Sequence, residues 1–373
     1  MTIYTNPTKL HAQVEISADT MHLTPKQREL LSVLYQIAEL VDIVYLKQAR
    51  QYTGSEIAAF DANKPNGFFP EGMSAENVSA FLAENPEKHA ATMSPFTVVV
   101  RDGESLTAIP YTEHFATEMK QISELLAQAS ELSDEPAFKE FLHLRAQAFA
   151  NNQYRESDIA WIHSHQGVFE FTVGPYESYA DNLFGVKRTF EAVLGIILQA
   201  ETAVAQSFQK YVSDFDAYLG NIYGYSTGTT LTPMVVIDQV SSAGESRYEH
   251  LPMAYNLPND LDIHQEVGSK KVFVRNVMAA KHTHISKMIA QRVLHPELAA
   301  SFDFENYLRF VIGHESSHGL SFHFDGENFG TAAAGIEECK ADVFGMWFMH
   351  YLADQGVISQ NDAGNCVMQN ITD

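Results

Sequence analysis

Apolar residues recur at helical spacing along most of the chain. The clearest start is Thr24-Pro25-Lys26-Gln27, in which a threonine that can cap a helix is followed by proline at the first helical position and by glutamine three residues after the cap. Leucine, isoleucine and valine residues continue the pattern to Tyr45. The same spacing predicts further helices over residues 75–84, 113–130 and 135–150, and over most of the chain after residue 276.

A smaller number of strands is predicted by short runs rich in β-branched and aromatic residues. These runs cover residues 96–100, 167–173, 234–240 and 271–274. A long helix is predicted to start near Phe184, and the segment Asn256-Leu257-Pro258-Asn259 has the composition of a connection. We therefore expect an α+β protein that is predominantly helical.

The length of the chain favours two packed lobes. It has 373 residues, of which 45% are hydrophobic, and no repeat or long linker marks an internal boundary. The change from a mixed to a helical pattern places the boundary near residue 280. We expect a mixed α/β lobe over residues 1–280 that binds substrate, a helical lobe over residues 281–373, and the functional site in the cleft between them.

Charge and cysteine content exclude some classes of function. The formal net charge is −23, so no basic stripe is available for nucleic acid or for an anionic membrane surface. The first 26 residues lack the pattern of a signal peptide, and the longest apolar run, residues 192–198, is too short to span a bilayer. Two cysteines are too few for a disulfide framework, which favours a cytoplasmic protein.

The most informative polar residues are His314-Glu315-Ser316-Ser317-His318. Four residues make nearly a full helical turn, so the two imidazoles would project from one face and could hold one metal ion, with Glu315 directed elsewhere. Apolar residues precede the motif at helical spacing, and Gly319 follows it as a helix end. Two solvent-facing histidines that meet by chance would give the same pentapeptide, so the motif needs a third ligand.

That third ligand is available in Glu337-Glu338-Cys339-Lys340-Ala341-Asp342. The apolar residues around this cluster predict a helix that ends at Gly356. A catalytic zinc takes three histidine or carboxylate ligands and leaves one position for water, and His314, His318 and Glu338 meet this need. A chance run of charge on a solvated helix face would explain the acidic residues but not their position after the histidine pair.

The neighbours of Glu338 receive other roles. Asp342 lies one turn further along the helix, where it can accept a hydrogen bond from the far nitrogen of a ligating histidine. Glu337 points about 100° away from Glu338, so we expect it, like Asp342, to contact a ligand of the metal and not the metal itself. Cys339 is also turned away, and we expect it to be a buried, inert thiol.

These residues together predict a hydrolase that holds one Zn²⁺ per chain. Zinc lowers the pKa of a bound water to near 7 and polarises the carbonyl under attack. Glu315 would take the proton of the water and pass it to the leaving amine as general base and acid. The expected chemistry is therefore hydrolysis of an amide, above all a peptide bond, and the ligand types favour zinc over other metals.

Two further stretches stand out beside the metal motifs. One is Gly174-Pro175-Tyr176-Glu177-Ser178-Tyr179, which is followed by Phe184-Gly185 and Phe190-Glu191. The other is Asn256-Leu257-Pro258-Asn259, which continues through Gly268-Ser269-Lys270-Lys271 to Asn276-Val277. The four stretches together resemble the dipeptidyl peptidase III family of zinc exopeptidases, and in particular its shorter bacterial relatives.

The resemblance implies a two-lobed zinc aminopeptidase that removes dipeptides from short peptides. It also implies that Glu177, Asn256 and Asn259 hold the free ammonium of the substrate and that Tyr179 helps to stabilise the tetrahedral oxyanion. Oxygen acceptors suit an ammonium group, and a phenol can donate to an oxyanion. The same residues also fit plainer roles, since asparagine forms turns and tyrosine packs in cores.

Two features depart from the family pattern. The histidines are four residues apart, where the family has one residue more, so the helix needs no bulge. The chain ends 31 residues after Asp342, where the family continues, so we expect the helical lobe to lack some substrate-binding groups. An unfinished lobe would expose Trp347, Phe348 and Tyr351, which favours a homodimer.

Two other functions fit the same residues. A zinc hydrolase could act on a non-peptide amide or ester, and N-acetylated peptides would distinguish it because only an aminopeptidase needs the free amine. A catalytically silent, zinc-containing binding protein is the second alternative, in which the metal would be left exposed or be blocked by a fourth protein ligand.

Overall fold

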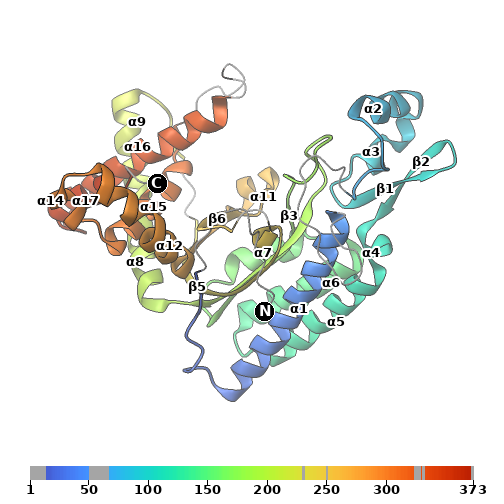
Figure 1. Ribbon diagram of the computed structural model, residues 1–373, viewed down its shortest axis with the longest axis horizontal. Coiled ribbons are helices and arrows are strands. Elements are labelled where there is room, and N and C mark those ends of the chain that lie inside the picture. The colour runs from blue at the N-terminus through green and yellow to red at the C-terminus, as the bar shows by residue number, and fades with distance from the viewer. Residues whose placement is uncertain are drawn as a thin grey trace. The chain divides into compact units, whose positions relative to one another are not determined.

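The computed structural model describes residues 14–49, 67–228, 232–248, 251–322, 329 and 332–370. Helices predominate, and the strands form one sheet of two and one of five (Figure 1). The α+β, predominantly helical class predicted from the sequence is therefore confirmed.

The chain divides into two compact units. The helical unit comprises Met1–Ser17, Ser207–Thr230 and Val274–Asp373, and the mixed unit comprises Ala18–Gln206 and Leu231–Phe273. The final change from mixed to helical structure thus lies at Val274, where the sequence had placed it near residue 280. Nothing in the spacing or composition of residues 207–230 indicates that they belong to the helical unit.

A five-stranded sheet forms the centre of the mixed unit. Its strands run in the order β3-β4-β5-β7-β6, so β3 and β6 are the two edges. Strand β4 is buried at every position, and it lies inside the sheet between β3 and β5. The strands are β3 (Phe169–Glu177), β4 (Thr189–Ile197), β5 (Met234–Gly244), β6 (Ala254–Leu257) and β7 (Lys270–Val274).

Strand β4 corrects the prediction of a long helix that starts near Phe184. The helix there, α8 (Gln199–Gln209), begins only after the strand. A strand that is buried on both faces is a continuous apolar run, and such a run cannot be told from a buried helix by periodicity alone. The sequence also missed β6, because this short strand runs into the Asn- and Pro-rich segment that was predicted to be a connection.

Helices cover one face of this sheet. Helix α1 (Pro25–Gln48) begins with the predicted capping box, in which Thr24 and Gln27 exchange hydrogen bonds, and it packs on β4 and β5. The next helices follow one another beside α1, as Figure 1 shows: α5 (Ala116–Leu132), α6 (Pro136–Asn151) and α7 (Arg155–His163).

The remaining elements of the mixed unit are short. Strands β1 (Thr97–Asp102) and β2 (Ser105–Pro110) form an antiparallel hairpin whose turn is Gly103-Glu104. The other elements are α2 (Ala75–Glu84), η1 (Pro86–Lys88), α3 (His89–Thr92), α4 (Tyr111–His114), α10 (Glu245–Tyr248) and α11 (Leu261–Glu266).

Three helices build the core of the helical unit. They are α15 (Phe304–His318), α16 (Ala333–Asp354) and α17 (Gln360–Asn370), and each packs on the other two. The helix predicted around the histidine motif is therefore present, and it ends at Gly319 as expected. The other elements are α9 (Val212–Tyr223), α12 (Arg275–Lys281), the π-helical turn η2 (His282–Ser286), α13 (Lys287–Val293) and α14 (Pro296–Ala300).

Helix α9 covers the aromatic residues that were predicted to be exposed. Phe348 is buried, and Trp347 and Tyr351 are half-buried with their rings 6.3 Å and 5.4 Å from that of Phe215 on α9. The rings of Trp347 and Tyr351 also contact Tyr218. The argument for a homodimer from an exposed patch at these residues is therefore wrong, because α9 supplies the missing cover from a distant part of the sequence.

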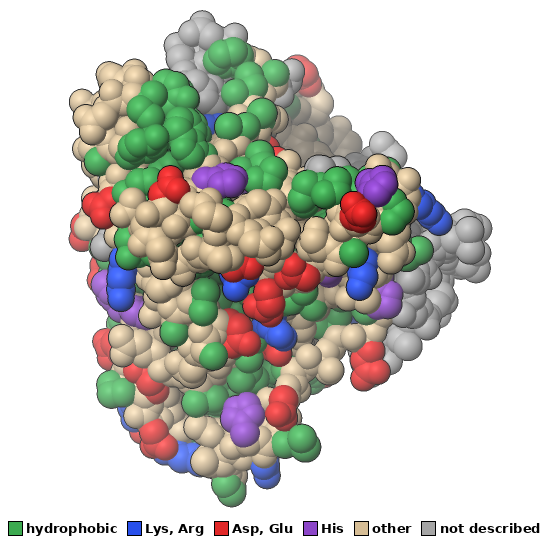
Figure 2. Space-filling view, turned by 90° about the vertical axis from the view of Figure 1, so that its left-hand side faces the viewer, with side chains coloured by type: hydrophobic (Ala, Val, Ile, Leu, Met, Phe, Trp, Pro, Cys, Tyr) green, Lys and Arg blue, Asp and Glu red, His purple; other side chains and the backbone are tan. Residues whose placement is uncertain are grey.

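Basic side chains are not concentrated on the surface that Figure 2 shows. Lysine and arginine are scattered there among acidic side chains, which agrees with the net charge of −23. That face therefore has no electrostatic footprint for nucleic acid. Within the described ranges, the structure contains no helix with both the length and the apolar character needed to cross a bilayer.

Two glycines allow α15 and α16 to approach each other closely. A Cβ atom at Gly345 would lie 2.7 Å from the backbone nitrogen of His314 and 2.9 Å from its Cα. A Cβ atom at Gly313 would lie 3.0 Å from the carbonyl oxygen of Gly345. Real Cβ contacts are longer, so any larger residue at this crossing must push the helices apart.

The crossing can be tested by Gly345→Ala. We expect the added methyl group to lower the free energy of unfolding by about 2 kcal/mol, because the nearest atoms are backbone and cannot move aside alone. Gly335→Ala on the same helix is the matched control, since a Cβ atom there meets open space. Urea unfolding should show Gly335→Ala to be neutral or up to about 1 kcal/mol stabilising; equal stability of both variants would contradict the tight crossing.

Candidate metal centre and acidic pocket

Helices α15 and α16 bring His314, His318 and Glu338 together. The two Nε2 atoms are 3.1 Å apart, and Oε2 of Glu338 lies 3.3 Å from Nε2 of His314 and 3.8 Å from Nε2 of His318. A point equidistant from the three atoms lies about 2.0 Å from each, which is the distance at which zinc binds histidine nitrogen and carboxylate oxygen. The residues present therefore fit a metal ion of this size.

The far nitrogen of each imidazole faces a carboxylate. Nδ1 of His314 lies 2.8 Å from Oδ1 of Asp342, and Nδ1 of His318 lies 3.1 Å from Oε1 of Glu337. A carboxylate can only accept, so Nδ1 must carry the proton in both rings. Asp342 and Glu337 thus each lie beside one of the two histidines, which leaves both Nε2 atoms with a free lone pair.

The three converging atoms cannot satisfy one another. Two unprotonated Nε2 atoms and a carboxylate oxygen are all acceptors, and at 3.1–3.8 Å their lone pairs repel unless a cation or a proton lies between them. The hydrogen bonds at Nδ1 fix the tautomer and the orientation of both imidazoles, so that both Nε2 atoms are directed at the position that a metal cation would take.

Lys340 is a member of this centre that the sequence analysis missed. Its buried ammonium lies 2.6 Å from Oε1 of Glu337, the same oxygen that faces His318. Burial alone would raise the pKa of Glu337, but the hydrogen bonds from Lys340 and His318 outweigh it and lower the pKa. Glu337 therefore stays ionised beside His318. A lysine three residues after a glutamate on a helix is the signal that could have indicated this pair.

Two other residues of the motifs lie outside the cluster. Glu315 is half-buried on α15 between the two histidines and is not one of the three converging groups. Cys339 is exposed, so the prediction that it would be buried is wrong, although it is correctly outside the group of ligands. The second turn of α16 leaves this position facing solvent.

A pocket of about 460 Å³ lies in the mixed unit, and all four predicted substrate residues line it. Glu177 ends β3, Tyr179 follows it, Asn256 lies on β6 and Asn259 comes just after β6. The remaining described lining residues include two more glutamates and no lysine, arginine or histidine: Thr172, Glu191, Val193, Glu245, Ser246, Pro252, Ala254, Tyr255 and Leu257. We call this site the acidic pocket.

Oxygen acceptors in the acidic pocket are held in place by their neighbours. The side-chain nitrogen of Asn259 donates to Oε1 of Glu177 over 2.9 Å. Oδ1 of Asn256 is buried and accepts no hydrogen bond from the described residues. Tyr179 is 66% exposed, and the charge of nearby Glu177 raises the pKa of its phenol. The pocket therefore presents a fixed carboxylate and an unused amide oxygen to a ligand.

Glu191 and Glu245 are two acidic groups that sequence reasoning did not assign. The hydroxyl of Ser246 donates to Glu191, and that of Thr189 donates to Glu245. Burial raises the pKa of Glu191 to about 7, and the charge of Glu177 adds to this effect. Phe190-Glu191 was part of the family resemblance, but nothing in its spacing indicated that the side chain points into the pocket.

Comparisons with known proteins agree with this fold. The model of peptidase family M49 matches residues 87–321. The solved structure of dipeptidyl peptidase III from Caldithrix abyssi superposes with a TM-score of 0.89 at 30% identity, covering 97% of this chain and 78% of that one. The chain thus belongs to peptidase family M49.

Curated proteins with similar sequences are much longer than the part of them that matches this chain. Nudix hydrolase 3 of Arabidopsis thaliana is 33% identical over 342 residues, which cover 82% of this chain and 44% of that protein. Dipeptidyl peptidase 3 of Nematostella vectensis is 27% identical over 52% of this chain and 31% of its own length. The chain therefore spans less than half the length of these curated relatives.

The raised pKa of Glu191 predicts a pH-dependent contribution to stability. Because its pKa rises from an ordinary 4.5 to about 7 on folding, the folded protein binds this proton more tightly than the unfolded chain. The contribution to the free energy of unfolding is fully present below about pH 4.5 and is lost as the pH rises to about 7, a change of at most about 3 kcal/mol.

Glu191→Gln tests this contribution, because glutamine keeps an acceptor for Ser246 but does not titrate. We expect urea unfolding to show that the variant gains stability relative to the wild type between about pH 4.5 and about pH 7.5. A difference between the two proteins that stays constant over this range would show that Glu191 is not held protonated by the fold.

Proposed function

We propose that the protein is a zinc-dependent aminopeptidase that cleaves short peptides near their free N-terminus, in the manner of a dipeptidyl peptidase. The observation that carries the proposal is the convergence of two imidazoles and Glu338 on one point, in a chain that belongs to a peptidase family. The names of the relatives in Nematostella vectensis and Caldithrix abyssi support the release of dipeptides.

His314, His318 and Glu338 would hold the zinc ion, and Asp342 and Glu337 would orient the two imidazoles. When bound, zinc supplies a water of lowered pKa and polarises the carbonyl of the scissile bond. Glu315, on the same helix as both histidines, accepts a proton from the attacking water and delivers it to the leaving amine. Both steps need a carboxylate that is half-open to solvent, as Glu315 is.

The acidic pocket would bind the ammonium group of the peptide. An ammonium has three donors and no acceptor, and the pocket offers the carboxylate of Glu177 and the unused Oδ1 of Asn256. Asn259 fixes Glu177 through its side-chain nitrogen, so its contribution to binding is the orientation of that carboxylate. Tyr179, whose phenol remains protonated, would donate to the oxyanion that forms during attack.

Glu315→Gln separates the base from the metal ligands. We expect this variant to keep one zinc per chain and to lose about 10²–10⁴-fold in kcat on a dipeptidyl reporter amide, because glutamine cannot take the proton. Glu338→Gln should instead lose zinc, as measured by elemental analysis after dialysis. If Glu315→Gln turns over at the wild-type rate, Glu315 is not the base. If the wild type holds zinc yet cleaves no peptide, the catalytically silent binding protein becomes the better explanation.

N-acetylation of the substrate tests the ammonium site. An acetylated peptide has no positive charge for Glu177, so we expect its hydrolysis to be lost, and we expect Glu177→Gln to raise KM by about 10-fold to 100-fold. Glu104→Gln removes the same charge from the exposed β1–β2 turn and should leave KM unchanged. Equal hydrolysis of free and acetylated peptides would favour the zinc hydrolase that acts on other amides or esters.

A further inference from the structure

Side chains join the two opposite edges of the five-stranded sheet. Strands β3 and β6 are four inter-strand spacings apart, which would separate them by about 19 Å in a flat sheet. The hydroxyl of Thr172 on β3 nevertheless lies 2.8 Å from the hydroxyl of Tyr255 on β6. The sheet is therefore curved so that its edges face each other, and these two residues close the gap.

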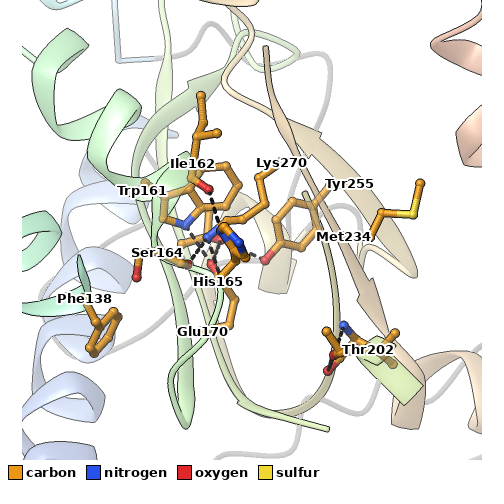
Figure 3. Close-up of polar contacts among 12 residues, drawn as sticks. Phe138, Trp161, Ile162, Ser164, His165, Glu170, Thr202, Met234, Tyr255 and Lys270 are labelled. Atoms are coloured by element: carbon orange, nitrogen blue, oxygen red, sulfur yellow. Dashed lines mark hydrogen bonds and ion pairs between the residues drawn. The ribbon is translucent and has the colours of Figure 1, made fainter. Parts of the chain in front are cut away.

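A buried ion pair lies directly behind this contact. Nζ of Lys270 on β7 lies 2.8 Å from Oε2 of Glu170 on β3, and both side chains are at most 1% exposed. Lys270 also donates to the carbonyl oxygen of Ser164 over 2.8 Å, and Trp161 donates to the other oxygen of Glu170 over 2.7 Å. Figure 3 shows Trp161, Glu170, Lys270 and Tyr255 converging in this way.

The ion pair is well satisfied for a buried one. The ammonium of Lys270 lies 3.8 Å from the centre of the Trp161 ring, in addition to its two hydrogen bonds. Burial lowers the pKa of Lys270 to about 8, and the opposing charge of Glu170 keeps it mostly ionised at neutral pH. Removing one partner would leave an unpaired charge in the interior, which is costly. We call these five residues, Trp161, Glu170, Thr172, Tyr255 and Lys270, the edge clasp.

The edge clasp adjoins the acidic pocket. Thr172 and Tyr255 belong both to the clasp and to the lining of the pocket, and the residue after Tyr255 is Asn256, which offers its free Oδ1 there. Movement of β6 away from β3 would therefore widen the pocket and displace Asn256 from Glu177 on β3. The aromatic ring of Tyr255 also occupies space at this end of the pocket.

We propose that the edge clasp fixes the width of the acidic pocket, and that Tyr255 limits the size of the peptide side chain that the pocket accepts. The role of Tyr255 rests on the proposed function, because that function identifies the ligand as a peptide. The role of the clasp in holding β6 does not depend on it. Tyr255 is thus a specificity-determining residue, and Glu170 and Lys270 are positioning residues.

Substrate preference tests the role of Tyr255. Two dipeptidyl reporter amides, with alanine or phenylalanine as first residue, are compared for wild type, Tyr255→Leu and Tyr255→Phe. We expect Tyr255→Leu to shift the ratio of kcat/KM toward phenylalanine by about tenfold or more, while Tyr255→Phe, which keeps the ring but loses the hydrogen bond to Thr172, shifts it by less. Ser130→Ala is the control. It removes a buried hydroxyl on α5 that donates to the backbone carbonyl oxygen of Lys139 on α6, and it should leave the ratio unchanged. An unchanged ratio in Tyr255→Leu, with zinc content as in wild type, would overturn this role.

Hydrogen exchange tests the clasp without any substrate. In Lys270→Met, and in the milder Thr172→Val, we expect the backbone amides of β6 to exchange about tenfold faster than in wild type, while those of β1 keep their rates. Unchanged β6 exchange in a folded Thr172→Val protein would show that the clasp does not hold this edge. If wild type cleaves neither reporter while β6 exchange responds as expected, the proposed function fails and the clasp stands.

Discussion

The close approach of α15 and α16 at Gly313 and Gly345 is the constraint on which the metal centre depends. His314 is the residue next to Gly313, and Asp342 and Glu338 lie about one and two helical turns before Gly345. Once the two backbones meet at this crossing, both carboxylates must lie against the imidazoles of α15. The ligand geometry is therefore a property of helix packing, and the hydrogen bonds at Nδ1 only complete an arrangement that the two glycines permit.

The two units solve the problem of buried charge in different ways. In the helical unit, the charges near the candidate metal site are compensated in part by Lys340, and a divalent cation would compensate the rest. In the mixed unit, buried charges are paired or bound by several acceptors: Lys270 with Glu170, Arg145 with Asp158 at 2.5 Å, and Lys187 with three oxygens at 2.6–2.7 Å. The acidic pocket gathers three glutamates, of which Glu177 accepts a hydrogen bond from an amide and Glu191 from a hydroxyl. Such a concentration of carboxylates is suited to a cationic ligand.

Much of this could be predicted from the sequence because it depends on local spacing. The capping box at Thr24, the helix that carries His314 and His318, and the positions of Asp342 and Glu337 all follow from helical periodicity. What could not be predicted depends on contacts between distant segments. Strand β4 resembles a helix until its neighbours in the sheet are known, and nothing in Ser207–Thr230 indicates that α9 will cover Trp347. The pairing of Glu170 with Lys270 joins residues 100 positions apart, across a curvature that no single strand encodes.

The curvature of the sheet determines how closely the acceptors of the acidic pocket surround a ligand. A sheet of five strands that remained flat would spread Glu177, Glu191 and Asn256 over a broad surface, where water would screen their interaction with an ammonium group. Because the edges are drawn together, these acceptors surround a limited volume, and the low exposure of Glu191 shows how little water enters. The same closure carries a cost, since it requires Glu170 and Lys270 to leave water. Trp161 donates a hydrogen bond to Glu170, and Lys270 donates one to the carbonyl oxygen of Ser164. These hydrogen bonds offset the cost of desolvation only when the two edges are close together. The ion pair therefore favours this curvature of the sheet over others, and it contributes more to the specificity of the fold than to its stability.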